Sequence, residues 1–306
     1  HDPPSVTFYN QALAVLGWGL WLAWMGRAPG GLDTPATPRA QAGHWALTGM
    51  LAVLAAAAFG SGVFGTLPAG LSLMGGGMSL AALLAFHSGW RQGRSVTRDG
   101  IAELFFGALA VAGGLGLLLA AVQVFMPSWA DGTFIASPNM AGRAVGNLRQ
   151  PNHFSTLMVF ACVGVAWLGA RKRLPVGVAS AALAAFIGVV VLTASRTGML
   201  AMLFLSMWGL FDRRLPRGLR WALIGAPVTY GLAWGAMWLW SHADASVAFA
   251  AQARLHDGSD ISSSRFGIWS NVLSLIAQEP WTGVGYGRFN FAWTMTPFPG
   301  RPVAFF

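Results

Sequence analysis

Long apolar runs constrain the fold of this chain more than any other feature. Each is about as long as the roughly 20 residues that a helix needs to cross a bilayer. Only 9% of the residues are charged, whereas soluble domains carry about 25%. We therefore predict an all-α fold, a polytopic transmembrane helix bundle of about eight helices. Eight apolar runs supply them: residues 8–26, 45–65, 67–88, 101–125, 153–170, 174–194, 197–211 and 220–240.

Residues 241–306 differ from the bundle predicted for residues 1–240, because they are mixed in polarity. Apolar side chains recur at helical spacing over residues 264–278, which predicts an amphipathic helix. The glycine-rich residues 283–287 follow no strand, so we predict a turn there and no nucleotide-binding loop. We expect residues 241–306 to start a large periplasmic loop that continues beyond this chain. The closing C-terminal helices are then absent, and the chain is expected to be a piece of a longer protein.

The positive charge of the chain predicts its orientation. Cytoplasmic connections of membrane proteins carry an excess of arginine and lysine. Alternate connections here hold 12 and seven such residues, so the richer set is predicted to be cytoplasmic. No soluble basic domain is visible, and nucleic acid is not expected as a partner. The richer set comprises Arg27, Arg39, Arg91, Arg94, Arg98, Arg171, Lys172, Arg173, Arg213, Arg214, Arg217 and Arg220.

The polar stretch GNLRQPNH, residues 146–153, lies on the opposite, outward side at the start of an apolar run. Polar side chains are costly in a bilayer, so such a cluster usually marks a site. The alternative is a structural helix start, with Pro151 in the first turn, Asn152 as the cap and His153 as a ring wetted at the interface.

Arg149, Arg196 and Arg265 predict an anion site on this outward side. Guanidinium groups bind phosphate oxygens in a bidentate fork and stay charged at any working pH. Arg196 lies in a very short hairpin between two apolar runs, and two helix N-termini would add partial positive charge. A lipid-linked diphosphate is the anion presented at that depth. For Arg143, Arg254, Arg288 and Arg301 we favour side chains that reach lipid headgroups.

Neither a metal nor a cofactor is expected. The outward acids form no Asp-x-Asp pair and no pair at helical spacing, and Cys162 is the only cysteine. His153 is the one histidine close to the predicted anion site, but the same position suits a structural role at a helix start.

Three motifs occur in a familiar order. Residues 146–153 resemble the motif of bacterial protein O-oligosaccharyltransferases, the pilin-glycosylation type of the O-antigen ligase superfamily. SRTG at residues 195–198 resembles the family's arginine-bearing hairpin. SRFGIW at residues 264–269, with Pro280 and GVGYG at residues 283–287, resembles the start of its large periplasmic loop.

This resemblance implies an inverting, metal-independent glycan transfer at the periplasmic face of the bacterial inner membrane. The donor would be an undecaprenyl-diphosphate-linked glycan, and the acceptor a pilin-like protein. Arg196 and Arg265 would hold the diphosphate, while Gln150, Asn152 and His153 would shape the cleft. The family's activating histidine is expected beyond Phe306, so we expect this piece alone to be inactive.

Two sets of alternatives stay open. Within the same chemistry, the alternatives are a lipopolysaccharide O-antigen ligase, with lipid A–core as acceptor, and an O-antigen polymerase. The alternative from another class is an anion or lipid transporter that uses the same arginines. A transporter predicts ionisable residues near mid-bilayer and broken helices there. The apolar runs carry almost no such residues, and the polar motifs gather at one surface.

Overall fold

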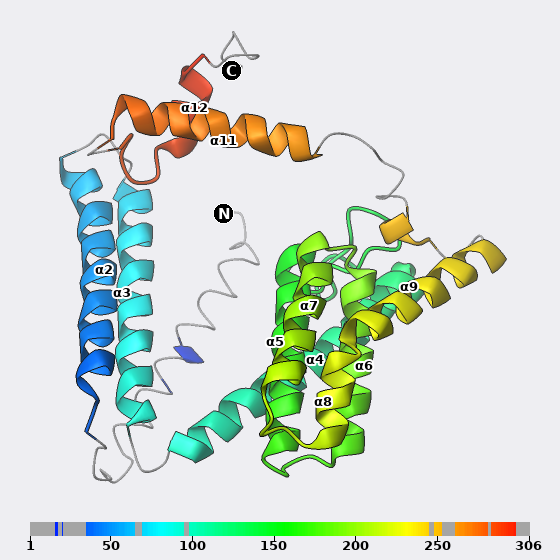
Figure 1. Cartoon of the computed structure of the whole chain (residues 1–306). Coiled ribbons are helices and arrows are strands. Elements are labelled where there is room, and N and C mark those ends of the chain that lie inside the picture. Colours follow the sequence, from blue (N-terminus) through cyan, green and yellow to red (C-terminus); the bar gives the residue numbers. More distant parts are fainter. Residues whose placement is uncertain are drawn as a thin grey trace. The chain divides into compact units, whose positions relative to one another are not determined.

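The structure is a computed structural model of the chain (Figure 1). It describes residues 16, 17, 20, 35–64, 69–94, 98–244, 248–252, 261–280 and 283–297. Every regular element in these ranges is a helix, which confirms the predicted all-α fold. The chain divides into two compact units. The hairpin unit comprises His1–Asp99 with Asp260–Phe306, and the bundle unit comprises Gly100–Ser259.

The hairpin unit is built on two helices packed side by side, α2 (Pro38–Val63) and α3 (Ala69–Gly93) (Figure 1). Small residues allow their close approach. Gly76 lies against the ring of Phe59, and the Ser72 hydroxyl donates to the Ala58 carbonyl at 2.8 Å.

Two further helices belong to this unit, α11 (Ile261–Gln278) and α12 (Phe289–Met295). The first confirms the helix predicted over residues 264–278. Gly283, Gly285 and Gly287 between the two helices have φ values of 61°, 93° and 74°. This left-handed conformation suits glycine, and it confirms the predicted turn.

The described part of the bundle unit includes six helices around an apolar core. They are α4 (Arg98–Phe125), which enters the unit at Gly100, α5 (Pro151–Ala170), α6 (Val176–Leu192), α7 (Arg196–Phe211), α8 (Arg217–Ile224) and α9 (Ala226–Ala243). The core centres on α5 and α6, where Phe154, Met158, Leu183 and Ile187 are almost wholly buried. Gly164 lets α5 approach the backbone of α4 at Phe106, as expected of helices that pack within a membrane.

The run predicted over residues 220–240 forms two helices, α8 and α9, which together are long and apolar enough for one bent span. The chain bends by 55° between α8 and α9, at Gly225. Pro227 lies two residues further on, and proline cannot donate the backbone hydrogen bond that would continue α8. The helix α8 turns Leu219 and Leu223 into the bundle, while Arg217 and Trp221 are exposed.

Among the described residues, four helices are long and apolar enough to cross a membrane, namely α2, α3, α4 and α5, and α8 with α9 forms a fifth span if counted together. Two shorter apolar helices, α6 and α7, have 17 and 16 residues. The polytopic helical fold is thus confirmed. Apart from residues 16, 17 and 20, the first predicted run lies outside the described residues, and the boundary at residue 240 stays a prediction.

Candidate functional site

The first motif forms the start of α5. Pro151 is the first helical residue, because its ring fixes a helical φ and its missing N–H is not needed there. The cap is therefore the residue before it. The Gln150 side chain accepts a hydrogen bond from the His153 backbone N–H at 2.9 Å. Asn152, which we predicted as the cap in the structural alternative, lies inside the first turn instead.

The second motif forms the start of α7, and it confirms the predicted short hairpin. The helix α6 ends at Leu192 and α7 begins at Arg196. Ala194 turns the chain with a left-handed φ of 51°. Ser195 then caps α7, because its hydroxyl accepts from the Gly198 N–H at 3.2 Å.

A side-chain hydrogen bond joins these two helix starts. The Ser195 hydroxyl donates to Asn152 Oδ1 at 2.9 Å, and the Thr197 hydroxyl lies 2.8 Å from it. Gly198 permits this proximity, because a Cβ there would overlap the Ser155 hydroxyl on α5. Two N-termini, each with partial positive charge, therefore lie side by side.

The loop between α4 and α5 packs beside this pair and is fixed by a buried amide. Gln123 near the end of α4 is completely buried. Its amide donates to the carbonyls of Ala136 and Gly146 at 2.6 and 3.3 Å. Its oxygen accepts from the N–H groups of Val145 and Gly146, both at 2.9 Å. Gln123 was missed from the sequence, where its only signal is a single amide inside an apolar run.

Asp131 stiffens the outer part of the same loop. Its carboxylate accepts from the backbone N–H groups of Thr133, Phe134 and Ile135 at 3.0, 2.8 and 2.9 Å. These donors, that of Ile135 foremost, lower the pKa of Asp131 below its ordinary value of 3.8. The carboxylate is thus ionised at neutral pH and engaged by the loop itself.

Two arginines of this loop are engaged by backbone carbonyls. Arg143 donates from Nε to the Thr193 carbonyl at 3.1 Å, so it links the loop to the end of α6. Our prediction that Arg143 reaches lipid headgroups did not foresee this bond. Arg149 is exposed, has a left-handed φ of 56° and donates from Nη2 to the Gly132 carbonyl at 2.7 Å.

Arg196 and His153 present exposed side chains at the two helix starts. Within the described part of the chain, neither the Arg196 guanidinium nor the His153 ring makes a hydrogen bond or ion pair. The structure thus brings Gln150, Asn152, His153 and Arg196 together, with Arg149 on the adjoining loop. We call this group the paired-start site.

Arg265 lies in α11 of the hairpin unit, and its side chain is outside the described residues. Its role stays a prediction. Arg254 and Arg301 also lie outside the described residues, and Arg288 precedes α12. Among the described side chains, no three of His, Cys, Asp or Glu gather closely enough to hold a metal ion.

Comparison with known families places both motifs inside matched segments. Residues 181–302 match the family model described as O-Antigen ligase. Residues 144–168 match the model described as Protein glycosylation ligase. The resemblance to the O-antigen ligase superfamily is confirmed. No curated protein and no solved structure matches the chain.

The two matched segments together contain every residue of the paired-start site. The glycosylation-ligase segment contains Gln150, Asn152 and His153, and the O-antigen ligase segment contains Arg196. At the coarse level, the chain is a multi-pass membrane protein whose matched segments are similar to glycosyl-transferring ligases. Such ligases act with a lipid-linked glycan donor and a protein or lipid acceptor in a membrane.

Proposed function

We propose that the protein transfers an oligosaccharide from undecaprenyl diphosphate to serine or threonine of an acceptor protein, at the periplasmic face of the inner membrane and without a metal. One observation carries this proposal. The Arg196 guanidinium is exposed, without a partner in the described part of the chain, beside two helix N-termini. This is an arrangement suited to a diphosphate.

The chemistry needs positive charge at the leaving group. In the transfer, the acceptor oxygen bonds to the anomeric carbon and gives up its proton to a base, while the bond from that carbon to the diphosphate oxygen breaks. The diphosphate leaves with an additional negative charge. Arg196 and the helix starts would stabilise that charge as it develops, which is the form of electrostatic catalysis that contributes most in many enzymes. The proposal assigns no residue as the base that takes the proton of the acceptor hydroxyl.

The match over residues 144–168 to a protein glycosylation ligase favours a protein acceptor. The match over residues 181–302 to O-Antigen ligase keeps lipid A–core as the second candidate acceptor, and a growing O-antigen as the third. These three share a donor and differ only in the hydroxyl that attacks.

A transporter is disfavoured by the one broken helix in the described chain. Alternating access would be expected to place ionisable groups at a break near mid-bilayer. Around Gly225, between α8 and α9, residues 221–229 include no acidic or basic side chain. The residues that form the break therefore carry no charge, and the nearest arginine, Arg220, donates to the carbonyls of Gly209 and Leu210 on α7.

The test replaces Arg196 by alanine and by lysine in the complete reading frame. The protein is expressed in cells whose periplasm holds a lipid-linked glycan, a pilin and lipid A–core. We expect Arg196→Ala to reduce transfer about 100-fold or more, as when one preorganised donor is removed from a transition state. Arg196→Lys should recover only part of the activity, because the bidentate fork is lost.

Arg39→Ala is the matched control, since Arg39 is an exposed arginine near the start of α2, in the other unit. Membrane insertion of all variants is checked by fractionation. Full activity of Arg196→Ala would refute the diphosphate role. A glycan that resists protease and resides on lipid A–core would keep that role and move the assignment to O-antigen ligase.

A further inference from the structure

A second cationic feature lies at the other end of α7, away from the paired-start site. Arg213, Arg214, Arg217 and Arg220 fall within eight residues, in the turn after α7 and in α8. The helix α7 has 16 residues, so at about 1.5 Å per residue it separates the two features by roughly 24 Å. Any ligand of this corner is therefore distinct from the diphosphate proposed above.

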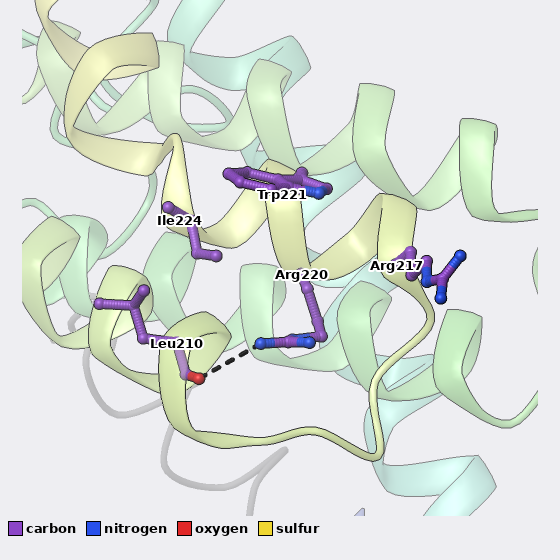
Figure 2. A pocket seen from close by; sticks show the side chains of 5 residues that line it. All are labelled: Leu210, Arg217, Arg220, Trp221 and Ile224. Carbon is purple, nitrogen blue, oxygen red and sulfur yellow. Dashed lines mark hydrogen bonds between the residues drawn. The ribbon is translucent and has the colours of Figure 1, made fainter.

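A hollow of about 300 Å³ lies at this corner. Figure 2 shows the side chains that line it. Arg220 forms one fixed wall, because its guanidinium donates to the carbonyls of Gly209 and Leu210 at 3.2 and 3.3 Å. These carbonyls end α7, so Arg220 stabilises the negative end of that helix. The lining residues are Leu210, Arg217, Arg220, Trp221 and Ile224.

The other arginines keep their charge available. Arg213, Arg214 and Arg217 are exposed, and their guanidinium groups make no hydrogen bond or ion pair with described residues. The one acid of the turn, Asp212, is engaged elsewhere. Its oxygens accept from Trp208 Nε1 at 3.1 Å and from the Arg214 backbone N–H at 3.0 Å. The corner thus carries an excess of positive charge.

Large apolar side chains surround this charge. Trp221, Phe211 and Leu210 are 69%, 75% and 51% exposed. Exposed tryptophan beside arginine is typical of the boundary between the acyl chains and the headgroups of a bilayer. Leu219 and Leu223 are buried and pack α8 against the bundle, so Arg217 and Trp221 lie on the outer side of this helix.

We propose that the corner between α7 and α8 binds an anionic phospholipid. The phosphodiester would lie at Arg217 and the free edge of Arg220, and an acyl chain would follow Leu210, Trp221 and Ile224. A free phosphate would use only the first part of this surface. The combination of two guanidinium groups with three apolar side chains matches a headgroup attached to acyl chains.

The experiment measures lipid binding to the whole chain in detergent micelles by native mass spectrometry. The probes are phosphatidylglycerol and phosphatidylcholine with identical acyl chains. We expect the wild type to bind phosphatidylglycerol more tightly than phosphatidylcholine. Arg217→Gln should weaken that binding about fivefold, the effect of one basic residue near a membrane surface. Trp221→Ala should weaken the binding of both lipids, because Trp221 would contact an acyl chain.

Lys172→Gln is the matched control. Lys172 is exposed in the turn between α5 and α6 and does not line the hollow. Its substitution removes one positive charge, as Arg217→Gln does. Unchanged binding in this variant, with weaker binding in Arg217→Gln, would support the site. Equal losses in both variants would mean diffuse charge attraction and overturn the proposal. Binding of inorganic phosphate as tight as that of phosphatidylglycerol would also overturn the proposal, because the acyl chains would then contribute nothing.

Discussion

Replacing Ser195 by alanine removes the link between the two helix starts. Ser195 is only 1% exposed, and its hydroxyl caps α7 through the Gly198 N–H and donates to Asn152 Oδ1. Loss of a serine cap costs about 1 kcal/mol. Loss of the donor to Asn152 adds about 0.5–1 kcal/mol, because that side chain is half-buried and water replaces part of the bond. We expect the free energy of unfolding to fall by about 1.5–2 kcal/mol.

Unfolding in mixed micelles of detergent and sodium dodecyl sulfate measures this change, and a double-mutant cycle isolates the Asn152 bond. Asn152→Ala alone leaves the Ser195 hydroxyl without its acceptor, and Ser195→Ala alone leaves Asn152 without its donor. The double variant leaves neither group unmatched, so its loss should be about 0.5–1 kcal/mol smaller than the sum of the single losses. Strictly additive losses would refute the coupling of the two helix starts.

Glycan transfer should follow the same pattern, because Arg196 is the residue directly after the cap. Ser195→Ala should lower transfer by less than Arg196→Ala, since the guanidinium remains and only its support is loosened. Ser195→Thr keeps the hydroxyl and should restore most of the transfer. Full transfer in Ser195→Ala, together with the expected loss of stability, would show that the hydrogen bond has no role in positioning Arg196.

Three further predictions concern the same region. Gly198→Ala should destabilise the bundle by about 1–3 kcal/mol through overlap with α5 and α6, whereas Gly188→Ala, with open space around it, should not; denaturant unfolding compares the two. Asp131 has a lowered pKa, so its stabilisation of the loop is present at neutral pH and lost as the pH falls through that value. The protection of residues 131–135 against hydrogen exchange, taken relative to the intrinsic exchange rate at each pH, should therefore fall at low pH in the wild type, while Asp131→Asn should be weakly protected at both pH values. Arg149→Ala should lower glycan transfer less than Arg196→Ala, because Arg149 already donates to a loop carbonyl; equal losses would contradict this order.

Local signals allowed the two helix starts of the paired-start site to be predicted. Pro151 marks the start of α5, and Ser195 before an apolar run marks the start of α7, so both helix starts follow from residue type and periodicity. What these signals do not contain is the distance between the starts. The hydrogen bond from Ser195 to Asn152 spans 43 positions and depends on how α5, α6 and α7 pack.

Two departures from the predictions have local physical causes. Gln150 caps α5 although glutamine is not among the preferred caps, because Pro151 takes the first helical position and leaves the cap to its neighbour. The bend between α8 and α9 was missed because hydropathy averages over the break. Gly225 and Pro227 together were the available signal, since one is permissive and the other removes a backbone donor.

The arginines of the bundle unit differ in whether their guanidinium groups are bonded to backbone carbonyls. This difference indicates which of them is available to bind a ligand. Arg143 and Arg220 donate to carbonyls near the ends of α6 and α7, where positive charge stabilises a helix C-terminus. Such groups are engaged by the fold. Arg196 begins a helix, where the same charge opposes the dipole and would be unfavourable without an anion. A cation held at a helix N-terminus, without a described partner and beside a second N-terminus, is best explained by a negatively charged ligand that binds there.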